Sequence, residues 1–160
     1  NALDLSRYED KSFDVVLMLG PLYHLQSESD RIKCISQAKR VLKDDGKIFF
    51  AFISNDFVFL TEFMYDKDYF STGDYDKQSF KLNDFPFVFH TVESARDLLL
   101  KADVKIIHEI ASDGASELIA ERINELSDAD YEQYLRYHFY ILEKITNYII
   151  MRTTASTQKI

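Results

Sequence analysis

The sequence has little of what several large classes of protein depend on. Its one cysteine, Cys34, excludes an intramolecular disulfide framework and a cysteine-rich zinc site. Four glycines and two prolines in 160 residues exclude collagen-like and linker-like chains. No run of lysine and arginine offers a surface for nucleic acid, and no apolar stretch is long enough to cross a membrane. We therefore expect a cytoplasmic protein with neither nucleic acid nor a membrane as partner.

What the sequence does contain is typical of one globular domain. Hydrophobic residues make up 46% of the chain, charged residues 29%, and the formal net charge is -8. A chain of this length builds one core of ordinary size rather than two. We therefore treat residues 1–160 as a single domain.

The first half of the sequence predicts a strand, a helix and a second strand. Residues 13–19 and 47–53 are short, nearly continuous apolar runs, which are typical of buried parallel strands. Between them, apolar residues recur at helical spacing after Ser27, a good N-cap residue, and the pattern stops at residues 44–46 (DDG). This order is that of a βαβ unit, so we expect an α/β fold with helices on both faces of a parallel sheet.

The second half of the sequence also predicts alternating helices and strands. Thr91 is positioned to cap a helix, and residues 104–111 predict a third strand. Residues 117–126 predict a short helix, and a long helix is expected to begin at Asp128. Residues 148–153 fit either a final strand or the end of that helix, because periodicity does not separate the two.

Residues 54–90 differ from the rest because they are rich in phenylalanine, tyrosine and acidic residues. We expect a short helix within 57–64 and extended structure within 79–90. So many aromatic residues are unusual in a solvated linker, which favours a lid over the end of the sheet with Tyr65, Tyr69 or Phe87 against a ligand. The alternative is that these residues extend the core or form the contact of a homodimer.

A candidate site follows the first predicted strand. Ligands of open α/β sheets bind beyond the carboxyl ends of the strands, where this sequence has Gly20, Tyr23 and His24. Glycine permits close approach of a ligand, and the two side chains after it can transfer protons or donate hydrogen bonds. The alternative is an ordinary turn in which both side chains simply pack. No spacing of histidine, cysteine and carboxylate residues predicts a metal site.

Several segments together resemble class I S-adenosylmethionine-dependent methyltransferases of the small-molecule type. They are residues 1–5 (NALDL), residues 12–14 (SFD), the segment 20–25 (GPLYHL) and residues 40–46 (RVLKDDG). The close resemblance covers residues 1–53, and a looser one covers 89–111. It implies a Rossmann-like fold, S-adenosylmethionine as cofactor and a small molecule as methyl acceptor.

The resemblance also implies roles for particular residues. Asn1 stands where the family usually has an acidic residue that reads the adenine amino group, with Ala2 beside it. Leu19 and Gly20 would lie along the methionine part of the cofactor. His24 or Tyr23 would face the substrate and take a proton from it.

One family feature is missing from the sequence. These enzymes hold the cofactor with a Gly-x-Gly-x-Gly loop after the first strand and an acidic residue at the end of the second. The four glycines, at positions 20, 46, 73 and 114, are too far apart to build that loop. We therefore expect the C-terminal portion of a methyltransferase, incomplete at the N-terminus and inactive by itself. The alternative is a non-catalytic Rossmann-like partner or pseudoenzyme.

Overall fold

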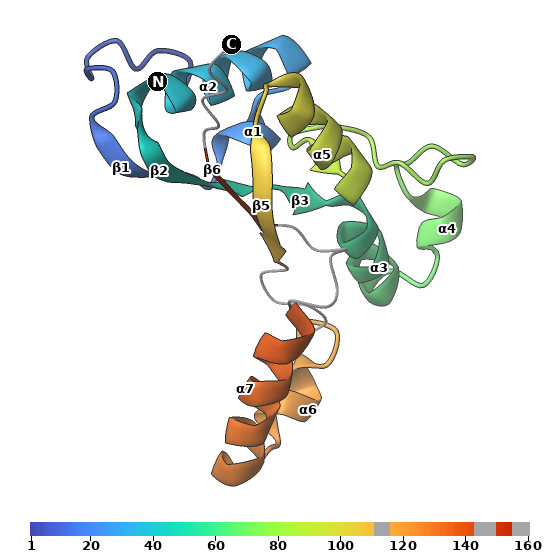
Figure 1. Ribbon diagram of the computed structural model, residues 1–160. Helices are drawn as coiled ribbons and strands as arrows, with labels where there is room; N and C mark the ends of the chain where they lie inside the picture. Colours follow the sequence, from blue (N-terminus) through green and yellow to red (C-terminus); the bar gives the residue numbers. More distant parts are fainter. Residues whose placement is uncertain (111–115, 143–149, 155–160) are drawn as a thin grey trace.

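The computed structural model describes residues 1–110, 116–142 and 150–154, the last of these as backbone only (Figure 1). The fold is α/β, as expected from the sequence. The strands are β1 (Phe13–Met18), β2 (Leu42–Ala51), β3 (Ile53–Ser54), β4 (Phe89–His90), β5 (Lys105–Ile110) and β6 (Ile150–Thr154). The helices are α1 (Pro21–His24), α2 (Glu28–Val41), α3 (Asn55–Tyr65), α4 (Tyr69–Thr72), α5 (Val92–Lys101), α6 (Ala120–Asn124) and α7 (Asp128–Leu142).

The main sheet has the strand order β1-β2-β6-β5. β1 and β2 are parallel, as the βαβ pattern predicts, whereas β6 runs antiparallel to both of its neighbours. The last described strand is therefore inserted between two earlier ones. Of the two alternatives for residues 148–153, the strand is correct for 150–153, and residues 148 and 149 lie outside the described residues.

The turn expected at residues 44–46 is present as a bulge within β2. The pairing with β1 passes from Phe13 opposite Leu42 to Val15 opposite Lys47, so the intervening residues of β2 are looped out. A Cβ atom at Gly46 would lie 2.7 Å from the Leu42 side chain and 2.9 Å from the Asp14 carbonyl oxygen. Glycine is therefore required here by the close approach of β1.

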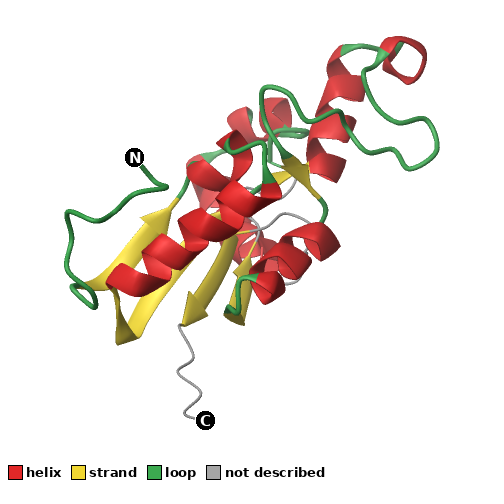
Figure 2. Cartoon of the chain, turned by 90° about the horizontal axis from the view of Figure 1, so that it is seen from above, coloured by secondary structure: helices red, strands yellow, loops and turns green. Residues whose placement is uncertain are grey.

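Two capped helices, α2 and α5, cover one face of this sheet (Figure 2). The Ser27 hydroxyl accepts a hydrogen bond from the Asp30 amide, and Thr91 does the same for Ser94, so both expected N-caps are present. The apolar face of α5 and its C-cap is buried in full: Val92, Ala95, Leu98, Leu99 and Ala102. The core lies between these helices and the buried side chains of β2, among them Ile48 and Phe50.

Two expectations about the opposite face of the sheet are wrong: that β1 is buried on both sides, and that helices cover both faces. Val15 and Leu17 of β1 are 51% and 64% exposed, so β1 is not the fully buried strand that its apolar sequence predicts. Helices on both faces were also expected, yet within the described residues α2 and α5 pack on one face only. The physical reason is that, among the described residues, no helix packs on the face of β1 that carries these two side chains.

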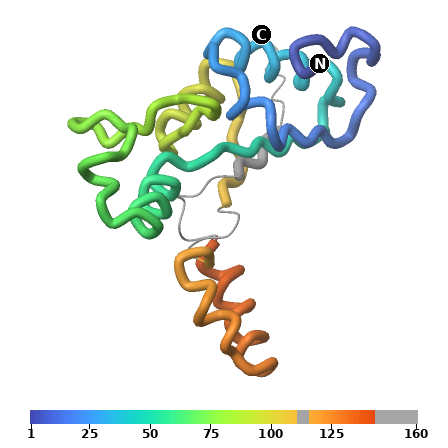
Figure 3. The backbone as a smooth tube through the Cα atoms, turned by 180° about the vertical axis from the view of Figure 1, so that it is seen from behind, coloured from blue at the N-terminus to red at the C-terminus, as the bar shows by residue number. Residues whose placement is uncertain are grey.

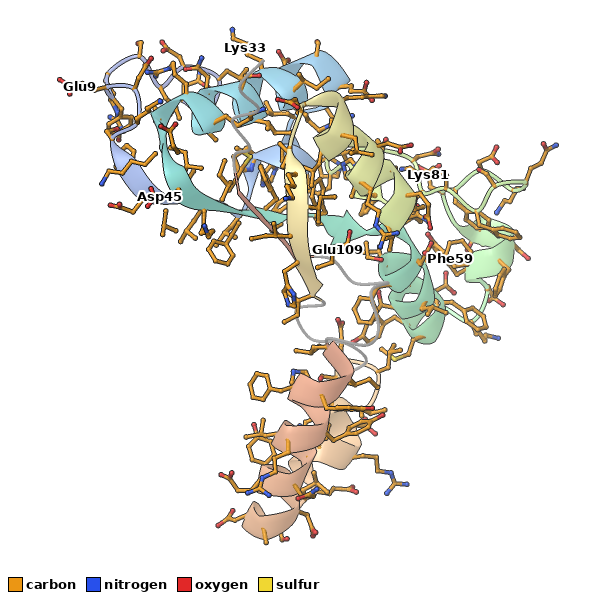
Figure 4. All side chains as sticks on the ribbon, in the orientation of Figure 1. Glu9, Lys33, Asp45, Phe59, Lys81 and Glu109 are labelled. Atoms are coloured by element: carbon orange, nitrogen blue, oxygen red, sulfur yellow. The ribbon has the colours of Figure 1, made fainter. Side chains whose placement is uncertain are left out.

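Residues 54–90 form a small aromatic core of their own beside the sheet. Phe59 of α3, Tyr69 of α4, Tyr75 and Leu82 are its buried members, and Figure 4 shows Phe59 within this part of the molecule. The short helix expected within 57–64 is present and longer, as α3. The extended structure expected within 79–90 is reduced to β4 and one isolated bridge between Tyr75 and Leu82.

α6 and α7 form a hairpin that stands away from the sheet (Figure 3). α7 begins at Asp128 as predicted, whereas α6 is shorter than the predicted helix over 117–126. Among the side chains described for α7, Leu142 alone is buried. In the described part of the chain, every helix is too short or too polar to cross a membrane.

Candidate functional site

The loop after β1 places Gly20, Tyr23 and His24 together at the carboxyl end of the strand. Gly20 precedes the single turn α1, with a backbone φ of -147°, which any residue can adopt. A Cβ atom at Gly20 would meet Tyr23 at 3.8 Å and His24 at 4.0 Å, which are ordinary contacts. The described chain therefore leaves room at Gly20 that its own folding does not require, unlike the crowded position of Gly46.

Tyr23 and His24 differ in what their polar atoms do. The Tyr23 hydroxyl donates a hydrogen bond of 2.5 Å to the Leu19 carbonyl, so its proton is already engaged. His24 is exposed, and its ring makes no hydrogen bond within the described residues. Its ring centroid lies 4.9 Å from that of Tyr23. Of the two predicted proton acceptors, His24 is the one with free ring nitrogens in this arrangement.

The end of the aromatic segment packs directly on this loop. The ring of Phe87 lies 5.1 Å from that of His24 and 6.1 Å from that of Tyr23. The Val88 amide donates to the Tyr23 carbonyl at 2.9 Å, and Gln26 donates to the Pro86 carbonyl at 2.9 Å. Of the three aromatic residues named for a lid, Phe87 is thus at the loop.

The other two named aromatic residues lie elsewhere. Tyr69 is buried in the separate aromatic core, and Tyr65 is exposed, with its hydroxyl 3.4 Å from a carboxylate oxygen of Glu117. The structure therefore brings one end of residues 54–90 to the loop and leaves α3 and α4 in their own cluster.

Two buried polar residues support the loop from behind, and sequence reasoning did not assign either of them to the site. Arg31 of α2 donates from one guanidinium nitrogen to the Leu25 and Gln26 carbonyls, at 2.7 and 3.0 Å. His90 of β4 is 5% exposed and packs its ring against Phe52, with centroids 5.0 Å apart. Burial above all, and then the charge of Arg31, lowers the pKa of His90 to about 4, so its ring is neutral at neutral pH.

Of the residues predicted to bind the cofactor, Ala2 and Leu19 lie near the carboxyl end of β1, and Asn1 lies beside Ala2 in the chain. Ala2 packs against the core and lines an apolar groove of about 300 Å³ that also includes Met18 and Pro21, next to the end of β1. Leu19 is half exposed at that end. The Asn1 side-chain oxygen accepts a hydrogen bond from the Leu3 amide at 3.0 Å and retains one lone pair for a second donor.

Metal and thiol chemistry find no support in the described residues. No group of three histidine, cysteine or carboxylate side chains is close enough to hold a metal ion there. Cys34 is buried, and burial raises the pKa of its thiol to about 11, so it is a weak nucleophile at neutral pH. His108 is exposed on β5, and His138 of α7 is within 3.1 Å of the Ser116 hydroxyl.

The fold and the strand-end loop define a Rossmann-like α/β protein with its candidate site at the carboxyl end of β1. Residues 1–50 match the family described as a methyltransferase domain. This confirms the resemblance to class I S-adenosylmethionine-dependent methyltransferases in the part of the chain where it is closest. A comparison with curated proteins found no match.

Solved structures of methyltransferases share the fold. An S-adenosylmethionine-dependent methyltransferase from Methanosarcina mazei matches with a TM-score of 0.54 and 18% identity, over 99% of this chain and 66% of that one. A possible histamine N-methyltransferase from Thermotoga maritima matches with a TM-score of 0.52 and 17% identity, over 98% of this chain and 62% of that one. The chain therefore spans slightly under two thirds of the length of these structures.

Proposed function

We propose that this chain is the acceptor-side portion of an S-adenosylmethionine-dependent methyltransferase acting on a small molecule. The observation that carries the proposal is the unfilled space at Gly20, next to Tyr23 and His24, at the strand end where such sheets bind ligands. The family match over residues 1–50 includes this loop. When bound, the cofactor supplies an activated methyl group.

The chain's own residues then have three tasks. Gly20 lets the methionine part of the cofactor approach the backbone, with Leu19 and Ala2 as apolar neighbours and Asn1 as hydrogen-bond partner of the adenine. His24, with its free ring nitrogens, takes the proton from the acceptor where the nucleophile carries one. Phe87 closes the loop on the side of the aromatic segment and excludes water from it.

The test is cofactor binding by calorimetry, on residues 1–160 and on a longer form of the protein that includes them. We expect the longer form to bind S-adenosylmethionine and residues 1–160 to bind it weakly, since the described residues offer no glycine-rich loop for it. Labelled cofactor and a panel of amines, phenols and thiols then identify the acceptor. Absence of binding by the longer form would instead support a non-catalytic Rossmann-like partner.

A further inference from the structure

Arg31 of α2 is a buried positive charge without a counter-ion in the described part of the chain. It is 9% exposed, yet no carboxylate of the described residues forms an ion pair with its guanidinium group. Two other arginines, Arg40 and Arg96, are paired with Asp10 and Glu109. Buried charges are normally paired or bound to a ligand, because removing a charge from water without a partner is costly. Arg31 is therefore the charge in this fold that calls for a ligand.

The carboxylate of Glu28, on the same helix, does not fill this role. It accepts hydrogen bonds from Lys101 at 2.8 and 3.0 Å. Lys101 lowers the pKa of Glu28 most, and Arg31 lowers it least. Glu28 is therefore the partner of Lys101, and the charge of Arg31 remains unbalanced.

The free hydrogen-bond donors of Arg31 lie along one edge of its guanidinium group. One terminal nitrogen, Nη1, donates to the carbonyls of Leu25 and Gln26. The Nε atom is buried without a hydrogen-bond partner, and the other terminal nitrogen, Nη2, donates to none of the described residues. Nε–H and one N–H of Nη2 are parallel donors whose spacing matches the two oxygens of a carboxylate. The edge left free is thus the one that binds carboxylates in a bidentate manner.

His90 is the second buried side chain behind the loop with an unpartnered polar atom. It is 5% exposed, and its Nε2 atom makes no hydrogen bond within the described residues. Burial lowers the pKa of His90 most, and Arg31 has the largest effect among the charges, whereas the Leu22 carbonyl has the smallest effect of all. The Ser94 hydroxyl lies 3.4 Å from Nδ1, so the neutral ring with its proton on Nε2 is a free donor beside Arg31.

This pair of side chains lies just below the surface, next to the candidate site. Gln26, which accepts from Arg31, is exposed, and Leu25, the other acceptor, directly follows His24. Adjacent Cα atoms are about 3.8 Å apart. A small molecule held at Arg31 is therefore within reach of the His24 ring.

We propose that Arg31 binds the carboxylate of a small organic acid through its Nε and Nη2 atoms, with His90 donating a further hydrogen bond from Nε2. Such two-pronged, charge-assisted bonding is the strongest that a guanidinium group makes, and it neutralises the buried charge. The binding itself does not depend on the proposed function. One extension rests on that function: the methyl acceptor carries a carboxylate in addition to its nucleophilic atom.

The experiment is an NMR titration of residues 1–160 with benzoate and, separately, with benzamide, an uncharged molecule of nearly the same shape. We expect saturable benzoate binding that shifts the Arg31 Nε–H signal and raises the pKa of His90, because a negative charge favours the protonated ring. Benzamide should bind at least tenfold more weakly. Equal binding of the two, no binding of benzoate, or binding that leaves both signals unchanged would overturn the proposal. No cofactor is present, so the result is independent of methyl transfer.

Variants assign the binding to these side chains. Arg31→Lys keeps the charge and removes the bidentate edge, so benzoate should bind at least tenfold more weakly. Arg136→Lys is the matched control, at an exposed position on α7, in the hairpin that stands away from the sheet (Figure 3). His90→Phe keeps a ring against Phe52 and removes the donor, and should weaken binding about threefold. Unchanged binding in Arg31→Lys, or equal weakening in Arg136→Lys, would contradict the proposal.

A third titration identifies the source of the carboxylate. Free methionine presents the carboxylate that the amino-acid end of S-adenosylmethionine would present. It should bind residues 1–160 more weakly than benzoate does, and Arg31→Lys should leave that binding unchanged. Tighter binding of methionine that is lost in Arg31→Lys would assign the carboxylate to the cofactor and overturn its assignment to the acceptor.

Discussion

The amide of Val88 donates a hydrogen bond of 2.9 Å to the carbonyl of Tyr23, which joins the end of the aromatic segment to the loop after β1. These residues are far apart in the sequence, and the Phe87 ring next to Val88 packs on His24. Residues 87 and 88 therefore contact the candidate site through one backbone hydrogen bond and one ring contact.

This link predicts that Phe87 matters more for catalysis than for stability. Phe87→Ala in a methyltransferase-active form should lower kcat/KM at least tenfold, because His24 loses the ring that fixes it. Cofactor affinity should change less than twofold. Leu100→Ala, at an exposed position on α5, is the control. Steady-state kinetics with calorimetry separate the two effects, and equal losses of affinity and rate would contradict a role confined to the acceptor side.

Gly20 and Gly46 should respond in opposite ways to alanine. Gly20→Ala should leave the free energy of unfolding of residues 1–160 within about 0.5 kcal/mol, because the added Cβ meets only ordinary contacts. Gly46→Ala should cost about 1–3 kcal/mol, since its Cβ would press on Leu42 and on the Asp14 carbonyl. Urea denaturation measures both. In a cofactor-binding form, Gly20→Val should abolish binding while the protein stays folded; normal binding would show that the strand-end site is misplaced.

His90 should make stability depend on pH in a defined window. Its folded-state pKa of about 4 lies below the ordinary 6.5, so between these values the unfolded chain binds a proton that the folded chain does not. The free energy of unfolding should therefore fall as the pH drops from 6.5 to about 4, by roughly 3 kcal/mol from this group. Denaturation at several pH values should show this slope reduced in His90→Leu and kept in His108→Leu, whose histidine is exposed. An unchanged slope in His90→Leu would assign the dependence to other groups.

Cys34 should be protected by the fold. Because it is buried with a thiol pKa of about 11, its labelling by an aromatic disulfide reagent at pH 8 should be at least a hundredfold slower than in denaturant. The absorbance of the aromatic thiolate that the reagent releases measures the rate of labelling. Rapid labelling of the native protein would mean that α2 opens readily from the sheet.

The open edge of β1 should promote self-association. Leu17, at 64% exposure, is part of an unpaired apolar strand edge within the described residues, a surface that attracts further strands. Leu17→Lys should therefore shift residues 1–160 toward the monomer in sedimentation experiments. Leu100→Lys adds the same charge to an equally exposed leucine on α5 and should have a smaller effect. Equal effects would indicate general solubility rather than pairing through this edge.

The parts of the fold that are specified locally could be predicted from the sequence. α2 and α5 follow from their caps and apolar spacing, and the strand-end loop follows from Gly20 after an apolar run. The exposure of β1 could not be predicted, because burial depends on what packs against its second face and not on its own residues. The contact of Phe87 with His24 has no local signal either, since it joins residues more than 60 positions apart.

The site residues divide in the same way. Tyr23 and His24 were named because their types and position suggest chemistry, whereas Arg31 and His90 carry no motif and became visible once their burial was known. Whether Asn1, Ala2, Leu19 and Gly20 hold the cofactor stays a prediction.

The position of β6 also constrains how the protein is made. The ribosome delivers β6 after every other described strand, yet this strand lies between β2 and β5 in the sheet. While the chain is being synthesised, β5 therefore has no partner strand among those described. Its backbone N–H and C=O groups form their sheet hydrogen bonds only after residues 150–154 have left the ribosome. Pairing between strands so far apart in the sequence slows folding. Until it occurs, the unpaired edge of β5 can aggregate or be bound by chaperones. A stalled chain that ends before Ile150 should accordingly be cut by protease at β5 while α2 and β2 stay protected.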